Sequence, residues 1–189
     1  MRDVELMREL KAAGKDFFTL PDLEKLTGLD RKSLHVALHR MAKRGAIQRA
    51  MRGIYVIPGS APRVERIAGQ LYFPCYLSFE SALSRFGVLN LIPYSLTFAT
   101  TNKTKTLDIL ERRVNYRQLK PALFFGFDLA DGYYIAKPEK ALLDLAYLST
   151  LRKATLPMEE LDLRSLSPSI LNELAERFPS PVREILDIN

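Results

Sequence analysis

The stretch "EKLTGLDRKSLHVALHRM" places two amphipathic helical segments on either side of a turn that is only three residues long. Gly28 is suited to end the first segment, and Asp30 is suited to cap a second helix that we expect to run from Arg31 to about Arg44. Two short helices joined by so short a glycine-containing turn are typical of a helix-turn-helix. This connection restricts the fold of the first third of the chain more than any other feature.

The residues before this turn predict one further helix and a short extended piece. We expect a helix that is capped by Asp3 and ends near Gly14, with an inward-facing apolar stripe formed by Val4, Met7 and Leu10. Phe17 and Phe18 indicate a short strand, and Thr19 with Asp22 forms the pattern of a capping box for the next helix.

The residues after the second helix predict a hairpin. Ala46–Ala50 and Ile54–Val56 are expected to be strands, separated by "MRG", where Gly53 can adopt a positive φ. Three helices followed by a hairpin form a winged helix-turn-helix, which we place at residues 1–58.

Charge is concentrated in the same part of the chain. Residues 31–52 carry five arginines, two lysines and both histidines but no carboxylate. Of the formal net charge of +6, nearly all lies in residues 1–56, which hold 12 Lys and Arg against 7 Asp and Glu. Like charges at helical spacing repel one another, so such a run favours an anionic partner outside the chain.

The expected recognition helix has an apolar stripe at Leu34, Ala37, Leu38 and Met41, so its cationic side chains face outward. We therefore predict a site for double-stranded DNA, with phosphates bound by Lys and Arg and bases read early in the helix. The predicted DNA-binding residues are Arg31, Lys32, Ser33, His35, His39, Arg40, Lys43, Arg44, Arg49 and Arg52.

Two other interpretations of this helix stay open. Some winged helices bind proteins, and a basic helix can be a solvated surface. His35 and His39 have the i, i+4 spacing that can hold a metal, but the sequence offers no third ligand, so we expect no metal site and no cofactor.

The remaining chain is expected to form a second domain, residues 64–189, after a hinge marked by Pro58, Gly59, Ser60 and Pro62. Its pattern mixes helices and strands, so the fold class is α+β: a winged helix-turn-helix followed by a mixed α/β domain. Expected helices are "YLSFESALSRFG" with Ser78 as cap, "KPEKALLDLAYLSTLRK", "SPSILNELAERF" and "SPVREIL". Expected strands are "SLTFATT", "RRVNYRQL", "ALFFGFD" and "GYYIAK", with "NKTKT" as an exposed loop.

This second domain shows no pattern of a catalytic site. It has no glycine-rich phosphate loop, G-x-S-x-G or H-E-x-x-H, and Asp144 is spaced to pair with Lys140. Cys75, the only cysteine, is expected to be a small buried hydrophobe. No apolar run approaches the roughly 18 residues of a membrane helix. We expect a non-enzymatic, cytoplasmic protein without a membrane partner.

Three segments together carry a resemblance to a known family: "RGIYVIPG", "YLSFESALSRFGVL" and "YYIAKPEKALLDLAYL". The chain resembles the AbiE antitoxins (AbiEi-like proteins) of bacterial type IV toxin–antitoxin systems, which share an A-x-P-E-K-A-L-L-D helix start. The helix 31–44 and Arg49 and Arg52 match the DNA-binding part of that family, and Pro138, Glu139, Lys140 and Asp144 match the helix motif.

The resemblance implies a transcriptional autorepressor that binds inverted repeats in its own operator. It also implies a C-terminal domain that counteracts a nucleotidyltransferase-like toxin without requiring a stable complex. The alternative is a winged-helix adaptor that contacts proteins and has no sequence-specific DNA binding. A dimer on paired half-sites and two monomers on adjacent repeats are equally compatible with the sequence.

Overall fold

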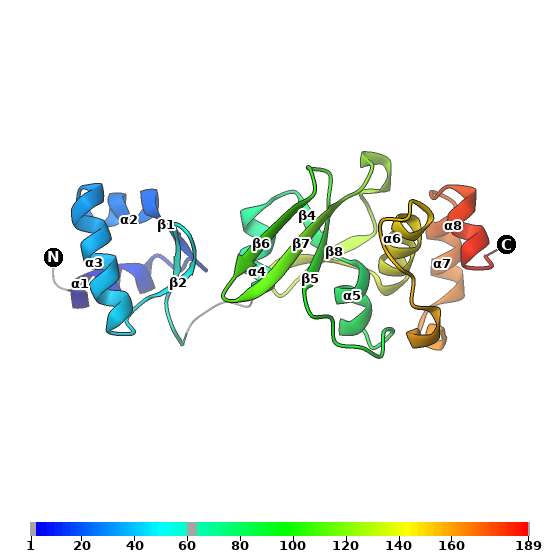
Figure 1. The fold of residues 1–189 in the computed structure, drawn as a ribbon, viewed down its shortest axis with the longest axis horizontal. Helices are drawn as coiled ribbons and strands as arrows, with labels where there is room; N and C mark the ends of the chain where they lie inside the picture. Colours follow the sequence, from blue (N-terminus) through cyan, green and yellow to red (C-terminus); the bar gives the residue numbers. More distant parts are fainter. Residues whose placement is uncertain (1–2, 60–63, 189) are drawn as a thin grey trace. The chain divides into compact units, whose positions relative to one another are not determined.

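The computed structural model describes residues 3–59 and 64–188, which form two compact units. Unit 1 comprises residues 1–67 with 108–111, and unit 2 comprises residues 68–107 with 112–189. Both units mix helices and strands, so the predicted α+β class is confirmed, with the helix-turn-helix at the N-terminus (Figure 1). Ser60 and Pro62 of the predicted hinge lie outside the described residues.

Unit 1 has the element order of a winged helix. Its elements are α1 (Asp3–Ala12), β1 (Phe18–Thr19), α2 (Leu20–Thr27), α3 (Arg31–Lys43), β2 (Gln48–Met51) and β3 (Ile54–Val56). The three strands form an antiparallel sheet in the order β1-β3-β2, so the short strand before α2 extends the wing hairpin.

The helix boundaries of unit 1 follow from local capping. Thr19 and Asp22 form the predicted capping box at the start of α2, and Gly28 ends that helix at φ 64°. Burial disfavours the ionised form of Asp22, but hydrogen bonds from Lys15 and Thr19 outweigh it and lower the pKa of this carboxyl to about 2. The capping box is therefore also an ion-paired site.

One hydrophobic core holds the helices of unit 1 against its sheet. Buried side chains at this core come from α1, α2, α3, the strands and the residues flanking the strands: Leu6, Leu10, Phe18, Leu23, Leu34, Leu38, Met41, Ile47, Tyr55 and Ile57. Burying each such leucine or methionine contributes about 1.5–3 kcal/mol. Val4, predicted to face inward on α1, is 79% exposed; Leu6 and Leu10 carry the buried face of that helix instead.

Unit 2 is built on a six-stranded mixed sheet in the order β6-β7-β5-β4-β9-β8. Its strands are β4 (Cys75–Leu77), β5 (Leu96–Thr100), β6 (Lys105–Ile109), β7 (Arg112–Gln118), β8 (Phe127–Ala130) and β9 (Tyr133–Ala136). Its α-helices are α5 (Phe79–Arg85), α6 (Pro138–Thr150), α7 (Pro168–Ala175) and α8 (Ser180–Ile185), and α4 (Val64–Leu71) crosses the boundary between the units. Three short 3-10 helices are η1 (Pro121–Leu123), η2 (Met158–Glu160) and η3 (Leu163–Ser165).

The centre of unit 2 is helix α6, which packs on α5, α7 and α8 (Figure 1). The predicted pairing of Asp144 with Lys140 is confirmed, and both side chains are fully buried. The Asp144 carboxylate also accepts hydrogen bonds from the Tyr76 hydroxyl at 2.9 Å and the Ser78 hydroxyl at 2.8 Å. Burial raises the pKa of the Asp144 carboxyl, whereas the Lys140 ammonium and the two hydroxyl donors act in the opposite direction.

The structure differs from the sequence-based expectations for unit 2 in five places. Helix α4 follows the expected hinge, in a stretch for which no helix was predicted, and the unpredicted short strand β4 lies directly before α5, which starts at Phe79 after Ser78 as expected. Ser78 makes no capping hydrogen bond, because its hydroxyl is used by Asp144. The expected loop "NKTKT" includes the start of β6, a polar edge strand.

The fifth difference is "ALFFGFD", where the prediction of a continuous strand was wrong. Residues 121–123 form η1, and β8 begins only at Phe127. The physical reason is packing: Phe124 and Phe127 surround the Tyr76 ring, with centroids 5.0 and 4.4 Å away. Gly126 lies between them at φ +71°, which breaks the extended backbone.

Candidate nucleic-acid interface

Helix α3 begins at a strong N-terminal cap. The Asp30 carboxylate accepts hydrogen bonds from the backbone N–H groups of Lys32 at 2.9 Å and Ser33 at 3.1 Å. It also accepts from the Ser33 hydroxyl at 2.6 Å. The Ser33 hydrogen bonds are the largest cause of the lowered pKa of Asp30. The first turn of the helix is thus held in place without any carboxylate on the helix itself.

The buried and exposed faces of α3 are those that the sequence predicts. Leu34, Leu38 and Met41 are buried, and Ala37 is half-buried. All eight predicted site residues in this region are exposed: Arg31, Lys32, Ser33, His35, His39, Arg40, Lys43 and Arg44. The helix therefore fixes one face on the core and leaves the cationic face accessible.

Not every one of these side chains is equally available. Arg40 and Arg44 already interact with other groups of the protein. The Ser33 hydroxyl donates its hydrogen to Asp30 and can therefore act toward a ligand only as an acceptor. Sequence reasoning did not foresee this, because the Asp30–Ser33 contact is a geometric detail of the cap.

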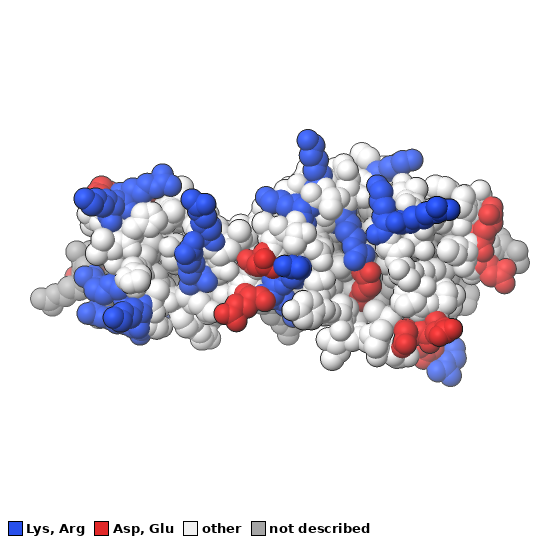
Figure 2. Space-filling model, in the orientation of Figure 1, with Lys and Arg blue, Asp and Glu red and all other residues white. Residues whose placement is uncertain are grey.

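The hairpin β2–β3 supplies the remaining two predicted residues, Arg49 and Arg52, which are both exposed. The pairing shifts by one residue between Arg49 and Met51, so the hairpin carries a bulge next to its turn. Gly53 occupies the turn at φ +78°, as expected from the sequence. In Figure 2, blue cationic side chains cover unit 1 in the regions of α3 and of this hairpin.

Val36 is a candidate contact that the charge pattern did not single out. Its side chain is 64% exposed, although it is apolar and lies on the cationic side of α3. It lines a hollow of about 550 Å³ together with Lys32, Ser33 and Arg40. An exposed aliphatic group between hydrogen-bonding side chains can contact the methyl group of thymine in a major groove. The signal available in the sequence was a valine at a solvent-facing helical position.

The two histidines of α3 are exposed one turn apart. Within residues 3–59 and 64–188, no group of three or more His, Cys, Asp or Glu side chains is arranged to hold a metal ion. Cys75 is buried, as predicted, and burial raises the pKa of its thiol to about 12. In the same described residues no helix is long and apolar enough to cross a membrane.

Comparison with known proteins agrees with this geometry in unit 1. Residues 5–58 match the family described as "Transcriptional regulator, AbiEi antitoxin". The match covers the three helices and the hairpin, including all ten predicted DNA-binding residues. No curated protein sequence matches the chain significantly.

A solved structure extends the likeness to the whole chain at the level of the fold. The RV2827C protein from Mycobacterium tuberculosis superposes with a TM-score of 0.64 at 17% sequence identity. The superposition covers 97% of this chain and 75% of that protein. At this identity the likeness shows a shared fold in both units.

Proposed function

We propose that this protein is a DNA-binding transcriptional autorepressor and the antitoxin of a type IV toxin–antitoxin system. The observation that carries the proposal is the exposed cationic face of α3, anchored by an Asp30 cap and accompanied by two wing arginines in the same unit. The family match over residues 5–58 supports a regulator of the antitoxin type.

In this proposal residues 1–58 are the DNA-binding domain and α3 lies in a major groove of the operator. Lys32, His35 and Val36 lie early on the exposed face, where a recognition helix contacts base edges. The other cations bind phosphates, with Arg49 and Arg52 reaching the backbone or minor groove beside the helix. The proposed contacts are Arg31, Lys32, Ser33, His35, His39, Arg40, Lys43, Arg44, Arg49 and Arg52.

Residues 64–189 are the proposed antitoxin domain, which counteracts a nucleotidyltransferase-like toxin without itself being an enzyme. The buried Lys140–Asp144 pair gives the P-E-K-A-L-L-D segment a structural role, because it fastens α6 to Tyr76 and Ser78. A repressor of its own operon acts in the bacterial cytoplasm, where we place it. Its operator, by this proposal, contains inverted repeats.

A second candidate function is a protein-binding adaptor, which a separate surface favours. Leu91, Ile92 and Tyr94 are 51%, 92% and 94% exposed in the loop between α5 and β5. Large apolar side chains grouped on an exposed loop are typical of protein contacts. A protein-binding loop does not exclude DNA binding by α3. An experiment that distinguishes the two functions must therefore alter α3 itself.

The test is fluorescence anisotropy with the duplex upstream of the protein's own gene and a scrambled duplex of equal length. The binding constant is measured at several salt concentrations for the wild type and for a variant with Arg31, Lys32, Arg40 and Lys43 changed to Ala. Each phosphate contact contributes about −0.9 to the slope of log K against log salt, so the loss of the three proposed phosphate contacts, from Arg31, Arg40 and Lys43, reduces the magnitude of the slope by about 3.

A charge-matched control carries Ala at Lys103, Lys120, Lys137 and Arg152, which are exposed residues of unit 2. The proposal expects the control to retain preference for the native duplex and the α3 variant to lose it. An equal loss in both variants would mean that net charge, and not α3, governs binding. Equal weak binding of the wild type to both duplexes would favour the adaptor.

A further inference from the structure

One face of the sheet in unit 2 is polar where β6 and β7 lie side by side. Thr104 and Thr106 alternate at the start of β6, and Asn115 and Arg117 alternate along β7. The Thr106 hydroxyl donates to the Asn115 side-chain oxygen at 2.9 Å, which places these residues on the same face. Sheet faces that pack on helices are normally apolar, so a polar stripe of this kind indicates contact with something other than the core.

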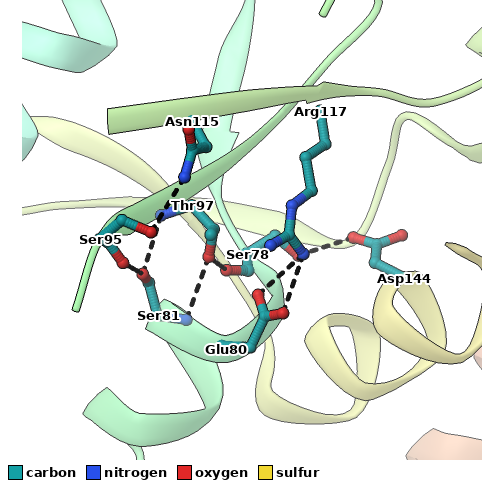
Figure 3. A network of polar contacts seen from close by, with 8 residues as sticks. All are labelled: Ser78, Glu80, Ser81, Ser95, Thr97, Asn115, Arg117 and Asp144. Carbon is teal, nitrogen blue, oxygen red and sulfur yellow. Dashed lines mark hydrogen bonds and ion pairs between the residues drawn. The ribbon is translucent and has the colours of Figure 1, made fainter. Parts of the chain in front are cut away.

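A network of hydrogen bonds holds two of these side chains in fixed positions (Figure 3). The Asn115 amide donates to the Ser95 hydroxyl at 2.9 Å. One terminal nitrogen of Arg117, Nη1, donates to both carboxylate oxygens of Glu80 at 2.9 Å, and the guanidinium lies 5.2 Å from the Phe79 ring centroid. These contacts orient Arg117 before any ligand arrives.

The same arrangement leaves several donors unused. Among the residues that the structure describes, none accepts a hydrogen bond from Nη2 or Nε of Arg117 or from the Lys153 ammonium. The Thr104 hydroxyl accepts from the backbone N–H of Gln118 at 3.3 Å, and within the described chain its own hydrogen has no acceptor. Three groups with open donors therefore stand close together without a matching acceptor.

The residues that carry these donors line a hollow of about 350 Å³, which we call the β6–β7 cavity. Its polar lining is Thr104, Thr106, Asn115, Arg117, Gln118 and Lys153. No carboxylate lines the cavity. Its two positive charges belong to Arg117 and Lys153, and Glu80, which pairs with Arg117, offsets only one of them. We propose that the β6–β7 cavity binds the phosphate group of a small phosphorylated ligand, such as a mononucleotide.

Phosphate is the anion that this donor set fits best. Arginine offers two parallel N–H groups to a phosphate, lysine adds a point charge, and a hydroxyl can donate to a third oxygen. A volume of about 350 Å³ lies within the range of small-ligand pockets and leaves room for a group attached to the phosphate. The Arg117 side chain is only 25% exposed, so it is recessed, whereas duplex DNA is bound by cations that stand out from the surface.

Isothermal titration calorimetry of the full chain tests this site with AMP, inorganic phosphate and adenosine in a low-salt buffer. The wild type is expected to bind AMP and phosphate but not adenosine. Lys153→Ala should weaken AMP binding about tenfold, as expected for the loss of a charge-assisted hydrogen bond. Thr104→Val should weaken it less, because a neutral donor is lost.

The control is Lys120→Ala, which removes the same charge from an exposed position outside the cavity and should change AMP affinity less than about twofold. Circular dichroism confirms that each variant is folded. Equal affinity for adenosine and AMP, or equal effects of the two lysine variants, would overturn the proposal. So would binding of duplex DNA, but not AMP, that depends on Lys153, because the cavity would then serve a nucleic-acid backbone. No heat change with millimolar AMP or phosphate would also reject it.

Discussion

Replacing Lys140 with methionine tests the buried ion pair on which unit 2 is built. The Lys140 ammonium donates to Asp144 and to the Tyr76 hydroxyl, and it lies within 5.3 Å of three aromatic ring centroids, those of Tyr76, Phe125 and Phe178. Methionine keeps the length and apolar stem of the side chain but removes the charge. Asp144 then retains its two hydroxyl donors in a fully buried position.

The loss of stability in this variant depends on the protonation state of the Asp144 carboxyl. An unpaired buried carboxylate is destabilising by several kcal/mol, so Asp144 will take up a proton instead. Protonating a group with an unfolded pKa near 3.9 costs ~1.36 kcal/mol per pH unit, which is about 4 kcal/mol at pH 7 and about 1.5 kcal/mol at pH 5. In the variant the folded state holds a proton that the unfolded state has released, so its stability rises as the pH falls.

The assay is urea unfolding followed by tyrosine fluorescence and circular dichroism at pH 7 and pH 5. Lys137→Met is the matched control, because Lys137 is exposed and directly precedes α6. We expect Lys140→Met to lower the free energy of unfolding of unit 2 by about 3–4 kcal/mol at pH 7 and by about 1–2 kcal/mol at pH 5. Equal stabilities of the two variants at pH 7, or a loss that does not shrink at pH 5, would refute this reasoning.

Four further predictions concern single positions. Gly53→Ala should destabilise unit 1 by about 1 kcal/mol in urea unfolding and weaken DNA binding, since φ is +78° at the wing turn. Asp22→Asn should cost about 1 kcal/mol at pH 7. Because the pKa of Asp22 is lowered to about 2, its contribution is complete above pH 4 and is lost between pH 4 and 2, so acid titration by circular dichroism should show a smaller stability loss in the variant. Gly126→Ala should lower the free energy of unfolding of unit 2 by about 1–3 kcal/mol in thermal unfolding. Gly126 has a positive φ, and a Cβ added there would lie 3.1 Å from Cγ of Lys140. Cys75 should react with a maleimide at pH 8 only after unfolding, because burial raises the pKa of its thiol to about 12; rapid labelling of the folded chain would contradict this.

The parts of unit 1 that sequence reasoning predicted are those governed by local chemistry. The Thr19–Asp22 box, the glycine after α2 and the Asp30 cap each depend on contacts within a few residues. The exposed face of α3 follows from helical periodicity, so the exposure of the candidate site residues could be predicted as well. The use of the Ser33 hydroxyl by its cap could not, because it depends on a side-chain rotamer.

The parts that sequence reasoning missed are governed by distant contacts. Strand β4 has only three residues and is buried on both faces, so it shows no alternation. Ser78 had the sequence position of a cap, yet its partner Asp144 lies 66 residues away. Glu80 orients the Arg117 side chain in the β6–β7 cavity, although the two residues are 37 positions apart in the sequence. Neither pairing can be recognised from the local sequence pattern.

The most direct test of the DNA-binding account is site-directed cleavage of the duplex upstream of the gene. A cysteine-reactive iron chelate is attached to Ser33→Cys on the exposed face of α3, while the buried native Cys75 stays unlabelled. Mass spectrometry confirms the single label, and a scrambled duplex serves as the control. The account predicts strand cuts grouped within the upstream sequence and absent from the scrambled duplex. Weak cuts spread evenly over both duplexes would contradict it, because α3 would then not lie in a specific groove.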